Sequence, residues 1–156
     1  MTIRNLFKKI PQTPKKTYGT HGRIEIPDLN IGIPLYLTED KNAQKIVDDQ
    51  DSAACICFGE QNIIVDHVSQ GLSNLINVKP GVTKAYIQYE DGSHESYICE
   101  CSQLGHIKKS SSGNQLFDWT WKHALGKNKN CLTIYTCLGR ADGDDQLVTL
   151  TYWSLQ

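Results

Sequence analysis

Cysteine and histidine are the two residue types in this chain that could form a nucleophilic site. The chain contains six cysteines and five histidines. Cys137 follows the apolar run of residues 132–136 and precedes a loop rich in glycine and aspartate, and His67 ends residues 63–66 in a similar setting. A strand end fixes the direction of a side chain, while the loop beyond it leaves room for a substrate. A thiolate can then attack while the imidazole accepts and returns the proton. The sequence therefore suggests a thiol–imidazole pair, with a buried cysteine and a surface histidine as the ordinary alternative.

Four other cysteines form two C-x-C pairs inside apolar runs, Cys55 with Cys57 and Cys99 with Cys101. Alternation along a strand predicts that both members of a pair point to one face. Zinc sites usually have about two to four residues between paired cysteines, so this spacing does not favour a metal. We expect mostly buried, reduced thiols, with disulfides as the alternative. The sequence implies no metal and no cofactor.

The elements that would position these side chains are mainly strands. Short apolar or alternating runs, several of them separated by turn signals such as Asp91-Gly92, are typical of β-strands. They occupy residues 22–26, 31–37, 53–58, 62–66, 83–89, 94–101, 132–137 and 147–153. About eight short strands favour a mainly β fold, a barrel or sandwich, over an α/β sheet.

The connections are expected to contain short helices. Residues 38–51 are polar except for Ala43, Ile46 and Val47, whose helical spacing predicts a surface helix. Residues 105–130 read as a long polar connection with a short helix at 116–125, and a connection of this length is usually functional or mobile.

Length and charge limit the classes of function. A chain of 156 residues fits one domain, which we place at residues 22–156 after a flexible lead-in at residues 1–21. The formal net charge of −1 gives no field that would select nucleic acid. The chain has no apolar run of the roughly 18 residues that a membrane span needs, and no signal-peptide pattern.

Four stretches resemble the sortase family, in the order that the family has them. Residues 22–36 resemble its opening strands, with Ile-Pro and later Pro-Leu-Tyr, and residues 62–67 resemble the strand that ends in the catalytic histidine. Residues 72–97 resemble the next turn, Lys-Pro-Gly and hairpin. Residues 132–137 are similar to the Thr-Leu-x-Thr-Cys strand that carries the nucleophile. The resemblance covers residues 22–153.

This resemblance implies a closed sortase-like β-barrel and a cysteine transpeptidase. Cys137 would attack a backbone carbonyl in the sorting-signal peptide of a surface or pilus protein, giving a thioacyl enzyme. His67 would protonate the leaving amine and later deprotonate the incoming one. The acceptor would be an amine, such as a cell-wall precursor or a pilin lysine, or water by default.

The chain departs from the family pattern at two positions. Sortases carry an arginine at the start of the strand after the nucleophile, whereas residues 144–148 contain none. Arg140 is the nearby replacement, either as a catalytic cation that stabilises the oxyanion or as a plain surface arginine. Asp66 precedes His67 where the family usually has glycine, and strand alternation favours a structural role for Asp66.

Three further residues are expected to contact the substrate if the resemblance holds. Trp119 and Trp121 lie in the connection that borders the peptide groove in sortases, and Thr136 precedes the nucleophile. The alternative for the two tryptophans is that they cover one end of the barrel.

Competing hypotheses stay open from the sequence. The missing arginine is also compatible with a catalytically weak or inactive sortase-like module that binds a peptide or protein. A metal- or redox-responsive protein that uses the C-x-C pairs is a second alternative. If the natural protein carries an anchor that this sequence lacks, we expect it at the extracytoplasmic face of the cell membrane, and otherwise in the cytoplasm.

Overall fold

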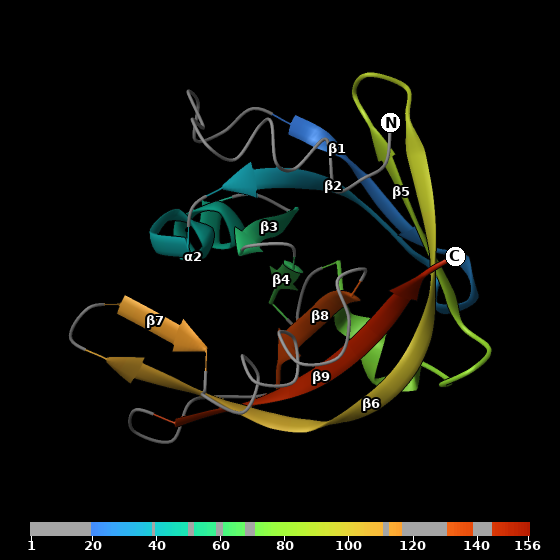
Figure 1. Ribbon diagram of the computed structural model, residues 1–156. Helices are drawn as coiled ribbons and strands as arrows, with labels where there is room; N and C mark the ends of the chain where they lie inside the picture. Colours follow the sequence, from blue (N-terminus) through green and yellow to red (C-terminus); the bar gives the residue numbers. More distant parts are fainter. Residues whose placement is uncertain are drawn as a thin grey trace.

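Alternating apolar residues along short strands build a closed β-barrel in this protein, seen in Figure 1. The structure is a computed structural model, and it describes residues 20–38, 40–49, 52–58, 61–67, 71–110, 113–116, 131–138 and 145–156.

Eight strands form the ring, in the order β5-β1-β2-β3-β4-β8-β9-β6, and β5 pairs with β6 to close it. A ninth strand, β7, pairs with the far end of β6 outside the ring. The predicted closed barrel of about eight strands is therefore confirmed. The strands are β1 (Thr20–Ile26), β2 (Ile31–Thr38), β3 (Ala53–Phe58), β4 (Gln61–Asp66), β5 (Lys84–Tyr89), β6 (His94–Ser110), β7 (Gly113–Leu116), β8 (Cys131–Cys137) and β9 (Asp145–Leu155).

Two pairs of strands run parallel, β2 with β3 and β4 with β8, and the other pairs run antiparallel. Residues 62–66 of β4 lie beside residues 132–136 of β8, in step along the ladder. Because the two strands are parallel, their carboxyl ends meet at the same edge of the barrel. This pairing brings together two strand ends that lie far apart in the sequence.

The two faces of the sheet bury separate apolar clusters. The inner cluster fills the barrel with residues from most strands and from the 3-10 turns η1 (Pro27–Leu29) and η2 (Ser73–Asn77). The outer cluster lies between the sheet and helix α2 (Asp40–Asp49). It comprises Ala43, Ile46, Val47, Ala54, Ile63, Val65, Tyr135, Val148, Leu150 and Tyr152, with Tyr36, Cys101 and Cys137 packed against it.

Helix α2 forms where its spacing predicted a helix. Ala43, Ile46 and Val47 make one apolar stripe and are buried, while Gln44, Lys45, Asp48 and Asp49 are exposed. In Figure 1 the helix lies beside β3 on the outside of the ring, and it approaches β7. The helix therefore covers the sheet face that carries the outer cluster.

The prediction of a polar connection from residue 105 was wrong. β6 continues to Ser110 and returns through β7, because β9 offers a backbone partner as far as Lys108. Backbone pairing with β9 holds this ribbon in place although its residues lack the apolar alternation by which strands are recognised. The helix expected at residues 116–125 falls largely outside the described residues, as do residues 1–19 of the lead-in expected at 1–21. Residues 20 and 21 belong to β1 and not to a flexible lead-in.

The expectation that Cys99 and Cys101 share one face was also wrong. A β-bulge lies between them, since Cys99 pairs with Trp153 and Cys101 with Tyr152, the next residue of β9. The extra residue, Glu100, reverses the alternation. Cys99 therefore joins the inner cluster and Cys101 packs against the outer one.

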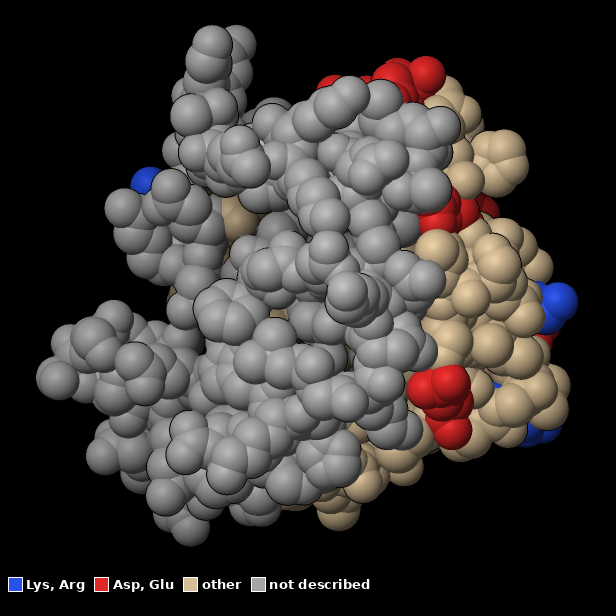
Figure 2. All heavy atoms as spheres, in the orientation of Figure 1, with Lys and Arg blue, Asp and Glu red and all other residues tan. Residues whose placement is uncertain are grey.

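Surface charge is mixed in the part of the chain that the structure describes. On the face shown in Figure 2, acidic and basic side chains both occur between uncharged residues. Within the same part of the chain, no helix is both long and apolar enough to cross a bilayer.

Candidate functional site

Cys137 and His67 lie at the meeting strand ends. Cys137 is the last residue of β8 and His67 directly follows β4. The last paired residues of β4 and β8 are Asp66 and Thr136, so His67 and Cys137 each directly follow a paired residue. Neighbouring strands lie about 4.8 Å apart, which makes His67 and Cys137 neighbours across the parallel pair.

Both residues also occupy the same face of the sheet. On β8, Tyr135 belongs to the outer cluster and Cys137 packs against it, two residues further on. On β4, Ile63 and Val65 belong to that cluster, and His67 continues the alternation. The Cys137 side chain is half-buried and 32% of the His67 side chain is exposed. The thiol and the imidazole thus share a partly open surface beside α2.

Asp66 fixes the chain where it leaves β4. Its side chain is 1% exposed, and its carboxylate oxygens accept hydrogen bonds from the backbone N–H of His67 at 2.8 Å and of Gly71 at 3.1 Å. These two contacts hold both ends of the segment from 67 to 71. This is the structural role that strand alternation predicted for Asp66, on the face opposite His67.

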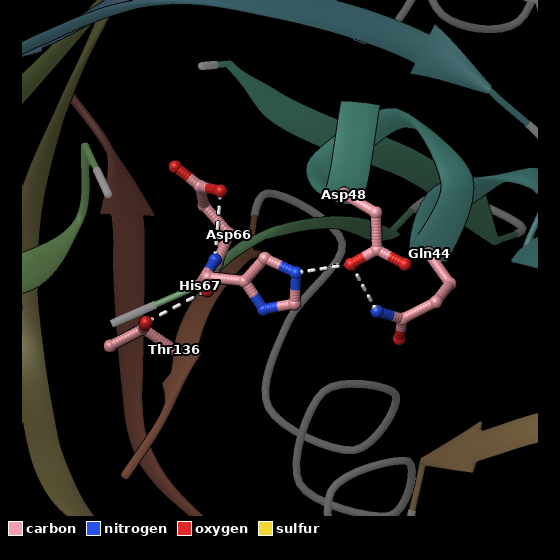
Figure 3. A network of polar contacts seen from close by, with 5 residues as sticks. All are labelled: Gln44, Asp48, Asp66, His67 and Thr136. Carbon is pink, nitrogen blue, oxygen red and sulfur yellow. Dashed lines mark hydrogen bonds and ion pairs between the residues drawn. The ribbon is translucent and has the colours of Figure 1, made fainter. Parts of the chain in front are cut away.

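Thr136 ties the two strand ends together. Its hydroxyl donates to the backbone carbonyl oxygen of Asp66 at 2.8 Å, and the residue is 1% exposed (Figure 3). The side chain therefore points away from the face that carries Cys137. A contact between Thr136 and a substrate stays a prediction.

The imidazole of His67 has a partner on α2. Its Nε2 lies 2.5 Å from Oδ1 of Asp48, and the same oxygen accepts a hydrogen bond from Nε2 of Gln44 at 2.9 Å. Figure 3 shows the ring between the end of β4 and the helix, with one nitrogen toward Asp48. Gln44 and Asp48 are one helical turn apart, so both side chains reach the same side of α2.

Sequence reasoning missed Asp48 and Gln44 as part of the site. Both belong to a helix whose four described exposed positions, 44, 45, 48 and 49, are all polar, so neither residue type stood out. Their i,i+4 spacing was the available signal, and it is common on any surface helix.

Gln146 belongs to residues 144–148, the stretch in which the sequence resemblance leads us to expect an arginine. Val148 pairs with Cys137, so Gln146, two residues earlier on β9, belongs to the same face. Its amide nitrogen donates to the carbonyl oxygens of Leu138 at 3.2 Å and Leu147 at 2.9 Å. Gln146 thereby holds the two ends of the loop that separates β8 from β9.

Three predicted site residues lie outside the described residues. They are Arg140, Trp119 and Trp121. Arg140 is the only arginine or lysine after Cys137 in the sequence.

The thiols differ in their surroundings. Cys55, Cys99, Cys101 and Cys137 form no disulfide, and Cys55 and Cys99 are buried. Burial raises the pKa of the Cys99 thiol to about 11. The hydrogen bond with the Cys101 backbone lowers this pKa, and the charges of Cys101 and Glu100 raise it further. Cys99 is therefore protonated at neutral pH and a poor nucleophile.

A separate hollow lies on the strands opposite the site. Two adjoining cavities, of about 330 and 400 Å³, share Arg23 and Glu25 of β1. Arg23 bonds the Glu25 carboxylate at 3.0 Å and the Gly32 carbonyl oxygen at 2.9 Å. The guanidinium is thus bound to two acceptors of the protein, and the residues that line this hollow include no cysteine.

The barrel and its paired strand ends define a fold of the sortase type, and solved structures agree. Sortase E1 from Streptomyces coelicolor, solved with a tripeptide in the active site, is similar at a TM-score of 0.62 and 12% identity, over 88% of each chain. Sortase A from Corynebacterium diphtheriae, a lid mutant, is similar at a TM-score of 0.58 and 16% identity, over 96% of this chain and 76% of that one.

A sortase C from Clostridium perfringens SM101 gives a TM-score of 0.56 at 15% identity, over 87% of this chain and 70% of that one. No protein-family model matches the chain, and no curated protein matches it in sequence. At such low identities the likeness defines the fold, and sortases of several classes share it with this chain.

Proposed function

We propose that this protein is a sortase-type cysteine transpeptidase, with Cys137 as the nucleophile and His67 as its acid–base partner. The proposal is supported mainly by the register of β4 and β8. In this register Cys137 and His67 each directly follow the last paired residue of their strand and share one face of the sheet. The fold shared with sortases supports the same reaction class.

The reaction has two balanced halves. The Cys137 thiol loses its proton to His67, and the thiolate attacks a peptide carbonyl carbon to form a tetrahedral oxyanion. The C–N bond then breaks, the leaving amine takes the proton from His67, and a thioacyl enzyme remains. An acceptor amine attacks the thioester carbonyl, gives its proton to His67, and releases the thiol, which regains that proton.

The cation for the oxyanion is assigned to Arg140 in this proposal. It lies three residues after Cys137, and the sequence offers no other arginine or lysine downstream. A guanidinium matches an oxyanion and a neighbouring carbonyl with its planar donors. Trp119 and Trp121 would contact apolar side chains of the peptide, and Thr136 would hold the two strand ends in place from the opposite face.

The substrate class follows from the same proposal. The donor is the sorting-signal peptide of a surface or pilus protein, and the acceptor is an amine such as a cell-wall precursor. Work on such substrates would take place at the extracytoplasmic face of the membrane, provided that an anchor accompanies the domain.

The test is mass spectrometry of the intact protein mixed with Leu-Pro-x-Thr-like and related peptides, with and without amine acceptors. We expect a thioacyl adduct on Cys137 that disappears when the acceptor is added. Cys137→Ala should abolish the adduct. Cys101→Ala is the matched control, because Cys101 is also half-buried beside the outer cluster, and this variant should keep the adduct. Arg140→Ala should slow its formation by roughly a hundredfold, as the loss of an oxyanion donor does.

The alternative is a sortase-like module that binds a peptide or protein without turning it over. The sequence favours it at one point, since residues 144–148 lack the arginine. Binding of the peptides by folded protein, with no adduct across the whole library, would support this alternative and contradict the transpeptidase.

A further inference from the structure

The contact between His67 and Asp48 joins the site to an element that the strand pairing does not require. His67 belongs to the end of β4, and Asp48 lies nineteen residues earlier on α2. Nε2 and Oδ1 lie 2.5 Å apart, within hydrogen-bond distance of each other, and an ionised carboxylate is a charged acceptor. Helix α2 is itself anchored on the sheet by Ala43, Ile46 and Val47.

The carboxylate is held on its other side as well. Gln44 donates to the same Oδ1 that contacts the imidazole, at 2.9 Å. Half of the Asp48 side chain is exposed, so without such a partner it would sample several rotamers. The pair formed by Gln44 and Asp48 therefore presents one oxygen to His67 from a fixed helical turn.

An ionised carboxylate only accepts hydrogen bonds, so it requires a proton on the ring nitrogen that it contacts. In neutral His67 that proton sits on Nε2, and Nδ1, the nitrogen nearer the strand end, becomes the acceptor. A carboxylate that accepts a hydrogen bond from one ring nitrogen fixes both the tautomer and the ring orientation of a histidine.

We infer that Asp48 is a positioning residue for His67: it holds the imidazole with Nε2 toward α2 and leaves Nδ1 to exchange the proton with Cys137. The inference rests on the proposed transpeptidase and deepens it, because it names the group that sets the working tautomer. Asp66, the other carboxylate near His67, is committed to backbone N–H groups and does not compete for the ring.

The test compares Asp48→Asn with Asp49→Asn in the whole protein. Both variants remove one charge from exposed positions at the end of α2. An asparagine amide can turn either its oxygen or its nitrogen toward the ring, so the substitution keeps the shape but no longer dictates the tautomer. Stability should change little, because a contact between two partly exposed polar side chains adds little to it.

Two readouts are needed. The first is the rate of iodoacetamide alkylation at each cysteine, resolved by peptide mass spectrometry, with Cys101 as the internal reference. The second is the ¹⁵N spectrum of the His67 ring, which distinguishes a protonated Nε2 from a protonated Nδ1. Asp48→Asn should slow alkylation of Cys137 by roughly tenfold, a share of what a positioned acid–base group contributes. It should also mix the two tautomers, whereas Asp49→Asn should match the wild type.

The outcomes separate the two proposals. If wild-type Cys137 reacts well ahead of Cys101 but Asp48→Asn changes neither the rate nor the ring spectrum, the role of Asp48 is overturned and the transpeptidase stands. If wild-type Cys137 reacts no faster than Cys101, the proposed function fails, and the positioning role fails with it. A variant that loses stability and leaves the tautomer unchanged would mark Asp48 as merely structural.

Discussion

The Thr136 hydroxyl donates to the backbone carbonyl oxygen of Asp66 across the parallel pair of β4 and β8, at 2.8 Å and out of contact with solvent. These two residues immediately precede Cys137 and His67. The bond therefore fixes the spacing of the two strand ends at the last paired position before Cys137 and His67. It acts on the site without belonging to its open face.

Thr136→Val removes this hydrogen bond while keeping the shape of the side chain. We expect the free energy of unfolding to fall by about 1–2 kcal/mol, since a buried carbonyl oxygen loses its partner. Alkylation of Cys137 should slow as well, because the two strand ends are no longer tied. Urea denaturation and site-resolved alkylation measure the two effects.

Thr151→Val is the matched control for that experiment. Thr151 is buried and donates to the carbonyl oxygen of Ile134, also on β8, at 2.7 Å. Its loss should lower stability at least as much, since Thr151 also accepts a bond from the Trp153 indole. Equal slowing of Cys137 alkylation by both variants would contradict a specific role for Thr136.

Asp66→Asn tests the buried carboxylate. An asparagine side chain has one acceptor oxygen where Asp66 uses two, for the N–H groups of His67 and Gly71. The free energy of unfolding should fall by about 2–3 kcal/mol, as for a lost hydrogen bond to a charged group. Urea denaturation measures this, with Asp28→Asn on the exposed η1 turn as the control. Equal stability of Asp66→Asn and the wild type would show that one oxygen suffices.

Gly71→Ala should destabilise the protein by crowding. A Cβ at this position would lie 2.3 Å from Cγ2 and 2.7 Å from Cδ1 of Ile33, a buried residue of the inner cluster. Overpacking of this kind costs about 1–3 kcal/mol. Thermal unfolding measures the loss, and Ile33→Val in the same chain should recover part of it. Gly81→Ala is not a suitable control, because Gly81 has a φ of +79° and is strained for another reason.

The raised pKa of Cys99 predicts that the free energy of unfolding falls in alkali. Burial raises its pKa from 9.0 to about 11 in the folded protein, so between these values the unfolded chain binds fewer protons than the folded one. Stability therefore falls as the pH rises from about 9 to about 11, and this contribution is complete below pH 9. Urea denaturation over this range measures the fall, and Cys99→Ala should flatten it. The same slope in Cys99→Ala would assign the effect to other groups.

The barrel could be predicted from the sequence because its strands alternate clearly and are separated by recognisable turns. The ribbon after residue 104 could not, because β9 stabilises it through backbone bonds that leave no apolar pattern. The bulge at Glu100 was hidden for a similar reason, since one extra residue changes pairing without changing composition. For the site, Cys137 and His67 were visible as strand-end residues. Their shared register depends on which strands pair, and the contact of Asp48 with His67 depends on how α2 lies against the sheet. Sequence spacing alone predicts neither the strand pairing nor the helix position.

The parallel register of β4 and β8 has a consequence for biosynthesis. Seventy residues separate Asp66 from Thr136, so His67 leaves the ribosome long before the thiol that it is to meet. Contacts between distant segments form late, because a long loop must first be closed. A nascent chain that ends before residue 131 can therefore complete the hairpin of β5 and β6, but it holds no thiol beside the imidazole. The pair of His67 and Cys137 therefore exists only in a barrel that β8 has joined.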